Sequence, residues 1–170
     1  MRAWLALGLV LLIAACAQTR TFEGSPDAGA RADELQQPLP EFPKPADYLP
    51  LQVSATTPFK FFIDAKSVSV GKDGVVRYSL IAKSNEGVLN VSFEGIRCSS
   101  RQYRVYAYGR PDNTWSEMRI SQWQQIPPDA RNAHRAVLYG DYFCAARMAI
   151  GTAEAAVGAL RRGPRGSSGL

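Results

Sequence analysis

The chain has 170 residues, a formal net charge of +5, 46% hydrophobic residues, three cysteines and one histidine. Its length suits one hydrophobic core rather than two. One histidine, no C-x-x-C pair and no clustered carboxylates leave few general bases or ligands, so we predict no catalytic residue, metal site or cofactor.

Residues 1–15 have the pattern of a lipoprotein signal peptide. After Arg2, the chain is almost wholly apolar up to Ala15. A run of about 13 apolar residues is too short for a membrane span, which needs roughly 20, but has the length of a secretory hydrophobic region. It leads straight into Cys16, and this junction resembles the lipobox of bacterial lipoproteins. The resemblance implies cleavage before Cys16 and acylation of that residue; the alternative is a cytosolic protein with a buried N-terminal helix.

The residue after the cysteine bears on localisation. It is Ala17 rather than aspartate, which by resemblance to enterobacterial sorting rules favours the outer membrane. Two or three acyl chains anchor a protein far more firmly than one, at about 0.8 kcal/mol per buried methylene. We therefore expect a protein anchored by lipid at the cell outer membrane, with its folded domain in the periplasm.

Residues 16–57 are predicted to form a lipidated, proline-rich tether. Dense prolines favour extended conformations, and after Cys16 the segment has six acidic and three basic residues, a net charge of −3. Its function would be to hold a domain away from the membrane surface. In the alternative, Phe42 and Tyr48 pack along the domain instead.

Residues 58–150 are predicted to form a single globular domain that starts as an antiparallel meander of about four to five strands. Apolar and polar residues alternate with period two in runs separated by short turns, which is typical of such a sheet. The runs cover 59–70, 75–84, 89–98 and 102–110. We expect one face of the sheet to be buried.

Helical signals follow the meander. Residues 114–126 fit a short strand or helix, and Asp129 could cap a helix over 131–145, where apolar residues recur near helical spacing. Residues 151–170 read as a weak, alanine-rich helix beginning at Thr152, and a disordered tail. The predicted fold class is α+β, with the C-terminal helices packed on one face of the sheet and joined to it by a disulfide.

That disulfide is predicted from the cysteines that remain after Cys16. An even remainder in an oxidising compartment favours a bond between Cys98 and Cys144. It would close a loop of about 47 residues and contribute roughly 4 kcal/mol in the chain-entropy model. The alternative is a free thiolate paired with His134 as a nucleophile.

Arginine and tyrosine concentrate between residues 97 and 110, which makes this region the candidate binding surface. On a regular strand, alternate residues share one face. Arginine offers a planar fork for phosphate or carboxylate, and tyrosine offers a stacking surface. The candidate ligand-binding residues are Arg97, Arg104, Tyr106, Tyr108 and Arg110.

The charge of the folded region points to the class of partner. Residues 58–149 contain 13 basic and 8 acidic residues, a net charge of +5. This favours an anionic glycan, lipopolysaccharide or an envelope protein as partner. Nucleic acid would fit the chemistry but not the compartment. The alternative is a solvated surface partly covered by the acidic tether.

Several segments, taken in order, resemble the CNP-one-like family of small proteobacterial lipoproteins. They are FFIDAKSVSVGKDGVVRYSLIAKS, NVSFEGIRC, YRVYAYGR, two tryptophans and NAHRAVLYGDYFC, within roughly 58–145. The family has no assigned activity, so the resemblance implies an envelope location and no catalytic residues. It draws attention to Glu94, Gly95, Arg97, Cys98, Tyr106, Tyr108, Gly109, Arg110, Trp115, Trp123 and Cys144, of which we expect the glycines to relieve crowding or make bulges and the tryptophans to fill core.

The sequence thus favours a lipid-anchored envelope protein with a non-enzymatic binding or assembly role. A small periplasmic hydrolase or glycan-acting enzyme, with Glu94 as acid or base, is the alternative, and a structural lipoprotein without a ligand is a third. A raised pKa of Glu94 in a cleft would favour the enzyme. A solvent-exposed ion pair between Glu94 and Arg97 would count against it.

Overall fold

The computed structural model describes residues 38–53, 57–127 and 133–165, all within one compact unit, Gln37–Leu170. The predicted signal peptide, Cys16 with most of the predicted tether, the proposed cap Asp129 and the end of the predicted tail lie outside the described residues.

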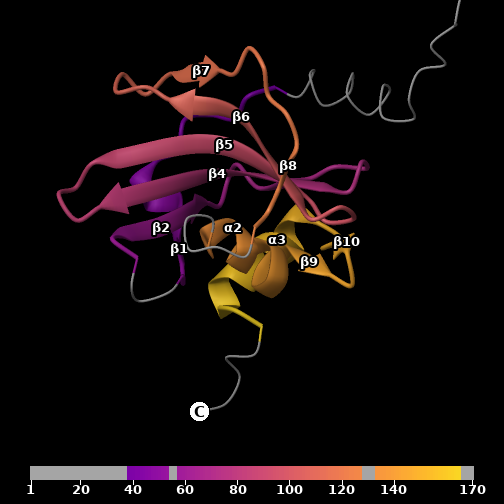
Figure 1. Cartoon of the computed structure of the whole chain (residues 1–170). Helices are drawn as coiled ribbons and strands as arrows, with labels where there is room; N and C mark the ends of the chain where they lie inside the picture. Colours follow the sequence, from indigo (N-terminus) through magenta and orange to yellow (C-terminus); the bar gives the residue numbers. More distant parts are fainter. Residues whose placement is uncertain (1–37, 54–56, 128–132, 166–170) are drawn as a thin grey trace, which may run out of the picture. The chain divides into compact units, whose positions relative to one another are not determined.

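The described residues form an antiparallel sheet of eight strands, more than the four to five predicted. Its main strands lie in the order β1-β2-β4-β5-β6-β7, while β3 pairs with β4 and β8 pairs with β6 (Figure 1). The strands are β1 (Tyr48–Leu51), β2 (Phe59–Asp64), β3 (Ser69–Val70), β4 (Val75–Ser84), β5 (Leu89–Arg97), β6 (Gln102–Gly109), β7 (Trp115–Glu117) and β8 (Gln124–Gln125).

The segment before β2 belongs to the folded unit, so the unit begins well before the expected boundary at 58. β1 pairs with β2 along its whole length, and the indole nitrogen of Trp115 donates a 2.9 Å hydrogen bond to the carbonyl of Pro40. Phe42 packs on Trp115 with ring centroids 5.1 Å apart. Proline is tolerated here because β1 is an edge strand. Phe42 and Tyr48 therefore pack along the domain, which was the alternative to an extended tether.

Both faces of the central strands are buried, whereas one buried face was expected. Val76 and Tyr78 of β4 point to one face, but Arg77 between them is only 2% exposed. The register explains the difference, since Tyr78 lies opposite Glu94 and Ser79 lies opposite Phe93. Paired residues share a face, so the apolar and polar sides of β4 and β5 are mixed on both sides of the sheet.

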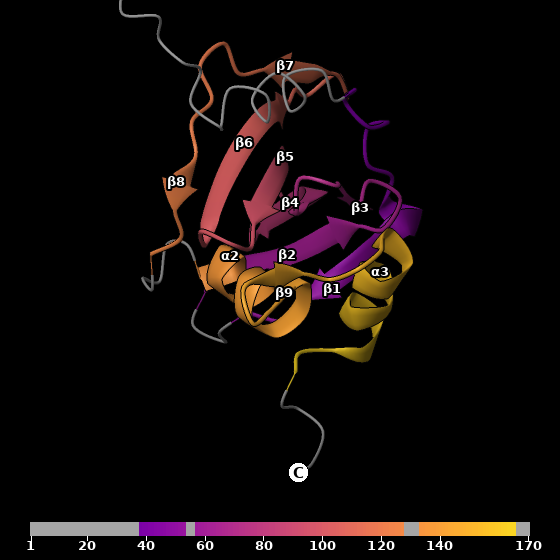
Figure 2. The same ribbon diagram turned by 90° about the vertical axis from the view of Figure 1, so that its right-hand side faces the viewer.

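The C-terminal part covers the Tyr78 face of the sheet (Figure 2). Its elements are α2 (Ala133–Val137), the π-helical η3 (Leu138–Phe143), the hairpin β9 (Cys144–Ala145) and β10 (Met148–Ala149), and α3 (Ala153–Arg162). Tyr78 packs on Phe143 at 5.4 Å between ring centroids. The helix predicted over 131–145 ends at Phe143, and Cys144 begins a strand. The α+β class, with helices on one face, is confirmed.

The last helix packs more firmly than its alanine-rich sequence suggested. The hydroxyl of Thr152 accepts a 3.1 Å hydrogen bond from the amide of Ala155, the cap expected there. Ala156 is 0% exposed and Leu160 is 4% exposed. Beyond the helix, Arg165 donates hydrogen bonds to the carbonyls of η3 and β9. Small side chains let α3 approach the core closely, so it is part of the core rather than a loose extension.

Candidate functional site

The predicted binding face on β6 is divided by a β-bulge. Arg104 lies opposite Gly95, but the register shifts so that Tyr106 becomes an extra residue and Tyr108 lies opposite Ser92. A bulge reverses the alternation of the residues that follow it. Arg104 and Tyr106 therefore lie on one face of the sheet and Tyr108 on the other, so the single face expected from the sequence does not exist.

The candidate residues on β6 have different surroundings. Arg104 is 6% exposed, and its Nε donates to the hydroxyl of Ser121 at 3.0 Å. Its guanidinium also lies 5.4 Å from the ring centroid of Tyr106. Tyr108 is 48% exposed, while Arg110 is exposed and bonded to Ser116 at 3.3 Å. Arg104 is thus a packed residue, and Tyr108 and Arg110 remain at the surface.

Arginines gather instead around the turn between β5 and β6. Arg97, the last residue of β5, lies 4.1 Å over the ring of Trp123. Arg101, within the turn, lies 5.4 Å over the ring of Tyr139. Arg147 reaches the turn from the β9–β10 hairpin and donates two hydrogen bonds, of 3.0 and 2.7 Å, to the carbonyl of Ser99. We call Arg97, Arg101 and Arg147 the arginine corner.

The backbone of this corner is unusual. Arg101, Ala146 and Arg147 have φ values of 54°, 47° and 65°. Residues other than glycine rarely occupy this region, at a cost of order 1–3 kcal/mol each, and they cluster at functional sites. Ala146 and Arg147 form a two-residue hairpin turn of the kind that usually contains Asn-Gly. The two hydrogen bonds of Arg147 to the neighbouring turn offset part of this cost.

The predicted disulfide lies beside the corner and is confirmed. Cys98 and Cys144 are bonded, with their Cα atoms 5.5 Å apart. Both are buried, and the hydroxyl of Tyr139 donates to the carbonyl of Cys98 at 3.3 Å. The bond joins the end of β5 to β9, so it fixes the helical layer against the sheet. A nucleophile formed by a free thiolate and His134 is excluded by this pairing.

Glu94, the residue that the enzyme alternative needed, is a buried structural group. It is 1% exposed and forms an ion pair with Arg135, whose Nε and Nη2 lie 2.8 and 2.7 Å from its two oxygens. Ser92 and Tyr78 donate further hydrogen bonds at 2.7 and 3.2 Å. These four bonds occupy the acceptor sites of a carboxylate. Its partner is Arg135 of α2 and not Arg97.

The pKa of Glu94 also argues against acid catalysis. Burial alone would raise the pKa, but the hydrogen bonds and charge of Arg135 outweigh burial and lower it. A general acid near neutral pH needs the opposite shift. The same carboxylate, together with burial, raises the pKa of Tyr78 well above its usual value. Glu94 therefore holds α2 to the sheet as the acidic member of a buried ion pair.

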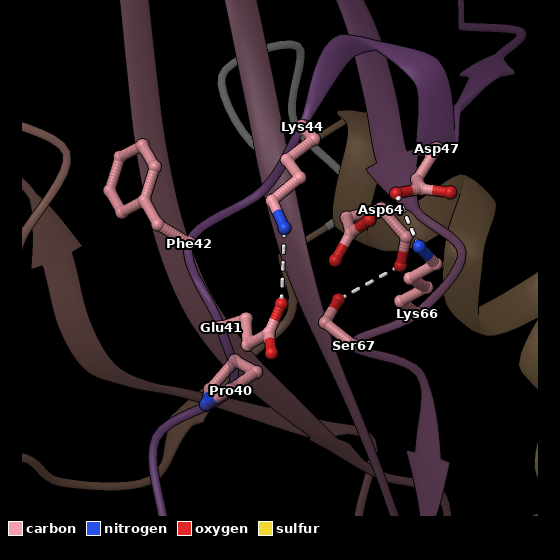
Figure 3. A pocket seen from close by; sticks show the side chains of 8 residues that line it. All are labelled: Pro40, Glu41, Phe42, Lys44, Asp47, Asp64, Lys66 and Ser67. Atoms are coloured by element: carbon pink, nitrogen blue, oxygen red, sulfur yellow. Dashed lines mark hydrogen bonds and ion pairs between the residues drawn. The ribbon is translucent and has the colours of Figure 1, made fainter.

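A pocket of about 340 Å³ lies between the N-terminal segment and the end of β2 (Figure 3). Lys44 pairs with Glu41 at 3.3 Å and Lys66 pairs with Asp47 at 3.1 Å. The residues that line this pocket are Pro40, Glu41, Phe42, Lys44, Asp47, Asp64, Lys66 and Ser67.

Asp64 is the most buried charged group of this pocket, with 3% of its surface exposed. Burial raises its pKa, and the nearby charge of Asp47 raises it further, while hydrogen bonds from the following turn act in the opposite direction. Sequence reasoning treated Asp64 as an ordinary strand residue. The pairing of Tyr48 with Asp64 brings Asp47 close to it, and no local sequence signal shows that pairing.

Metal binding has no support in the described part of the chain. No group of three or more histidine, cysteine, aspartate or glutamate side chains there is arranged to hold a metal ion. None of the helices within the described ranges has the length and apolar character needed to cross a membrane. Cys16, the predicted lipidation site, lies outside those ranges.

The sequence matches a known protein family over most of its length. The model of the CNP1-like family matches residues 27–161. This chain belongs to the CNP1-like family. The resemblance stated from the sequence is confirmed, and the match includes the N-terminal segment that packs on β7.

The chain is also similar to a protein described as Cryptic neisserial protein 1 of Neisseria gonorrhoeae. It is 34% identical over 98 residues, which is 50% of this chain and 48% of that protein. The chain therefore aligns with about half the length of the relative that it matches. No solved structure matches the chain significantly.

Proposed function

We propose that this protein is anchored by lipid at Cys16 in the cell envelope, most naturally at the outer membrane facing the periplasm, and has a non-enzymatic binding role. The lipobox-like junction of the apolar N-terminal run with Cys16 supports the anchor. The bond between Cys98 and Cys144 fits an oxidising compartment. The four bonds on Glu94 give no support to the enzyme alternative.

We further propose that the arginine corner is the binding surface, in place of the β6 face. The observation that carries this is the exposure of Arg101 and Arg147, neither of which forms an ion pair with a carboxylate in the described ranges. Two exposed cations held by a disulfide-braced turn form a preorganised site for phosphate or carboxylate groups. An anionic glycan of the envelope, such as the phosphorylated core of lipopolysaccharide, suits this charge.

The test is binding to deacylated, phosphorylated lipopolysaccharide core, with the dephosphorylated core as the matched ligand. Arg101→Glu should weaken binding at least fivefold, because a carboxylate replaces a cation at the site. The control is Lys72→Glu, which makes the same charge change at an exposed turn between β3 and β4. Wild-type affinity should also fall as salt is added.

Two results would contradict this proposal. One is equal weakening by Arg101→Glu and Lys72→Glu, which would show that only the net charge matters. The other is equal affinity of the wild-type protein for the phosphorylated and dephosphorylated cores. The melting temperature of both variants serves as the control for folding, since both side chains are exposed.

A further inference from the structure

A second hollow of the domain is mostly apolar and is separate from the arginine corner. It is a groove of about 800 Å³ between the N-terminal segment, the start of β5 and the turn after β6. This volume lies within the range of small-molecule sites, roughly 300–1,000 Å³. Its lining residues are Phe42, Pro43, Lys44, Pro45, Tyr48, Val88, Leu89, Asn90, Val91, Gly109, Arg110, Pro111 and Asn113.

The walls of the groove are built by fixed contacts. Phe42 is held against Trp115, and Tyr48 packs on Phe62 with ring centroids 5.8 Å apart. At Gly109 a Cβ atom would come within 2.9 Å of the Phe42 ring and 2.8 Å of Val91. The absence of a side chain at Gly109 therefore lets Phe42 approach β6 closely, so the groove depends on folding of the N-terminal segment onto the sheet.

Two large apolar side chains in the groove are exposed to solvent. Val88 is 60% exposed and Leu89 is 48% exposed, whereas Val91, which lines the same groove, is only 8% exposed. Single exposed apolar residues are common, but neighbouring ones that line a hollow mark a ligand site. The exposed apolar area here is thus available to an apolar ligand.

The charge of the groove selects the other part of the ligand. Two cations, Lys44 and Arg110, line it, and no carboxylate is among its lining residues. Lys44 also pairs with Glu41, but both side chains are largely exposed, and such pairs contribute little. An anionic group at the groove would therefore meet two positive charges, and the carboxylates near them, Glu41 beside Lys44 and Asp112 beside Arg110, lie outside the lining.

We propose that this groove binds one molecule of an anionic amphiphile, with an acyl chain along the apolar wall and a carboxylate or phosphate at Lys44 and Arg110. A second copy of the chain is a poorer occupant, because an interface of two identical grooves would bring two pairs of these cations together. The hollow shape suits one inserted chain rather than a flat membrane face. The inference goes beyond the anchor and holds whether or not Cys16 is acylated.

The test uses the full chain with Cys16→Ser, which carries no acyl chain of its own, titrated with laurate below its micelle concentration. The readout is the methyl NMR signals of Val88 and Leu89, with the methyl signals of Ile120 as the internal control, since that side chain is exposed and outside the groove. Laurate should shift the groove signals in a saturable manner and leave Ile120 unchanged. Acetate, which lacks the chain, should shift neither.

Matched variants separate the two parts of the site. Leu89→Glu should weaken laurate binding at Val88 at least tenfold. Met148→Glu, at another exposed apolar position of 67% exposure, should have no effect. Replacing both cations, Lys44→Gln with Arg110→Gln, should weaken binding of laurate at least threefold but not that of dodecanol.

Other outcomes would overturn the inference. These are shifts without saturation, equal shifts at Ile120, or equal effects of Leu89→Glu and Met148→Glu. Laurate binding that does not change without the two cations would remove the anionic head from the proposal. If Leu89→Glu lowers the melting temperature, Val88→Glu at the more exposed neighbour replaces it as the test.

Discussion

At the scale of single residues, buried polar groups decide which chemistry the domain can perform. Glu94 and Arg135 form a bidentate pair deep in the sheet–helix interface. Removing one member of such a buried pair costs about 3–5 kcal/mol, because the other charge is left without compensation. If a substitution at Glu94 abolished a function of the protein, the cause would therefore be unfolding of the domain and not removal of a catalytic group. Sequence proximity suggested Arg97 as the partner, but the partner is 41 positions away.

His134 should make stability depend on pH. It is 8% exposed, stacks on Phe61 at 4.7 Å and has no hydrogen-bond partner for Nε2 among the described residues. Burial lowers its pKa to about 4, with Glu94 acting to raise it and Arg135 to lower it. Because the folded pKa lies below the unfolded value of 6.5, stability is fully present above pH 6.5 and is lost as pH falls towards 4.

His134 should lower the free energy of unfolding by about 3 kcal/mol as the pH falls, because each unit of pKa shift corresponds to about 1.36 kcal/mol. Urea unfolding of the wild type at pH 7, 5.5 and 4.5 should show the decline, and His134→Phe, which keeps the ring stack, should reduce it. Asp64, whose folded pKa is raised, acts with the opposite sign, and Glu94, whose folded pKa is lowered, acts with the same sign. Both carboxylates are present in the wild type and in the variant, so the comparison isolates the contribution of His134. If the stability of His134→Phe declined as steeply with falling pH as that of the wild type, the pH dependence could not be assigned to His134.

At the scale of elements, the bulge in β6 determines which residues share a face. It places Tyr106 over Gly95, where a Cβ atom would lie 2.7 Å from the tyrosine hydroxyl oxygen and 3.0 Å from Val75. Alternation in a sequence cannot show an inserted residue, because one extra position changes the parity of all that follow. The local signs of crowding or of a bulge in this part of the sequence are the glycines at positions 95 and 109.

Gly95→Ala should destabilise the domain by about 1–3 kcal/mol, the usual cost of overpacking a core. Val75 is fully buried, and the ring of Tyr106 has the guanidinium groups of Arg77 and Arg104 at 5.9 and 5.4 Å from its centroid. The matched control is Gly140→Ala, where a Cβ atom would meet nothing within 4 Å. Chemical denaturation measures both. Equal free energies of unfolding for Gly95→Ala and Gly140→Ala would show that the packing of Tyr106 does not require a glycine at position 95.

The strands and the disulfide were predictable because they rest on local alternation and on counting cysteines. The runs at 75–84 and 102–110 became β4 and β6 with almost the same ends. β1 was missed because prolines hide an edge strand that forms only through pairing with β2. The helix over 131–145 was predicted too long, since π-helical and extended backbone replace its second half.

At the scale of the whole molecule, the described unit joins a braced sheet–helix core to two open surfaces of different chemistry. The arginine corner is charged and rigid, whereas the groove beside Phe42 is apolar with a cationic border. The sequence indicated the charge but placed it on β6. It did not indicate the groove, whose walls come from three segments far apart in the chain. The proposed role of the arginine corner rests on attachment of the chain to the envelope, whereas the proposed ligand site in the groove does not.

That attachment is tested most directly by the intact mass and thiol content of the protein extracted from the membranes of the cells that make it. We predict a mass that corresponds to cleavage before Cys16 plus two or three acyl chains, with no reactive thiol because Cys98 and Cys144 are bonded. A chain that retains residues 1–15, carries no acyl group and has an unmodified thiol at Cys16 would contradict the proposed anchor.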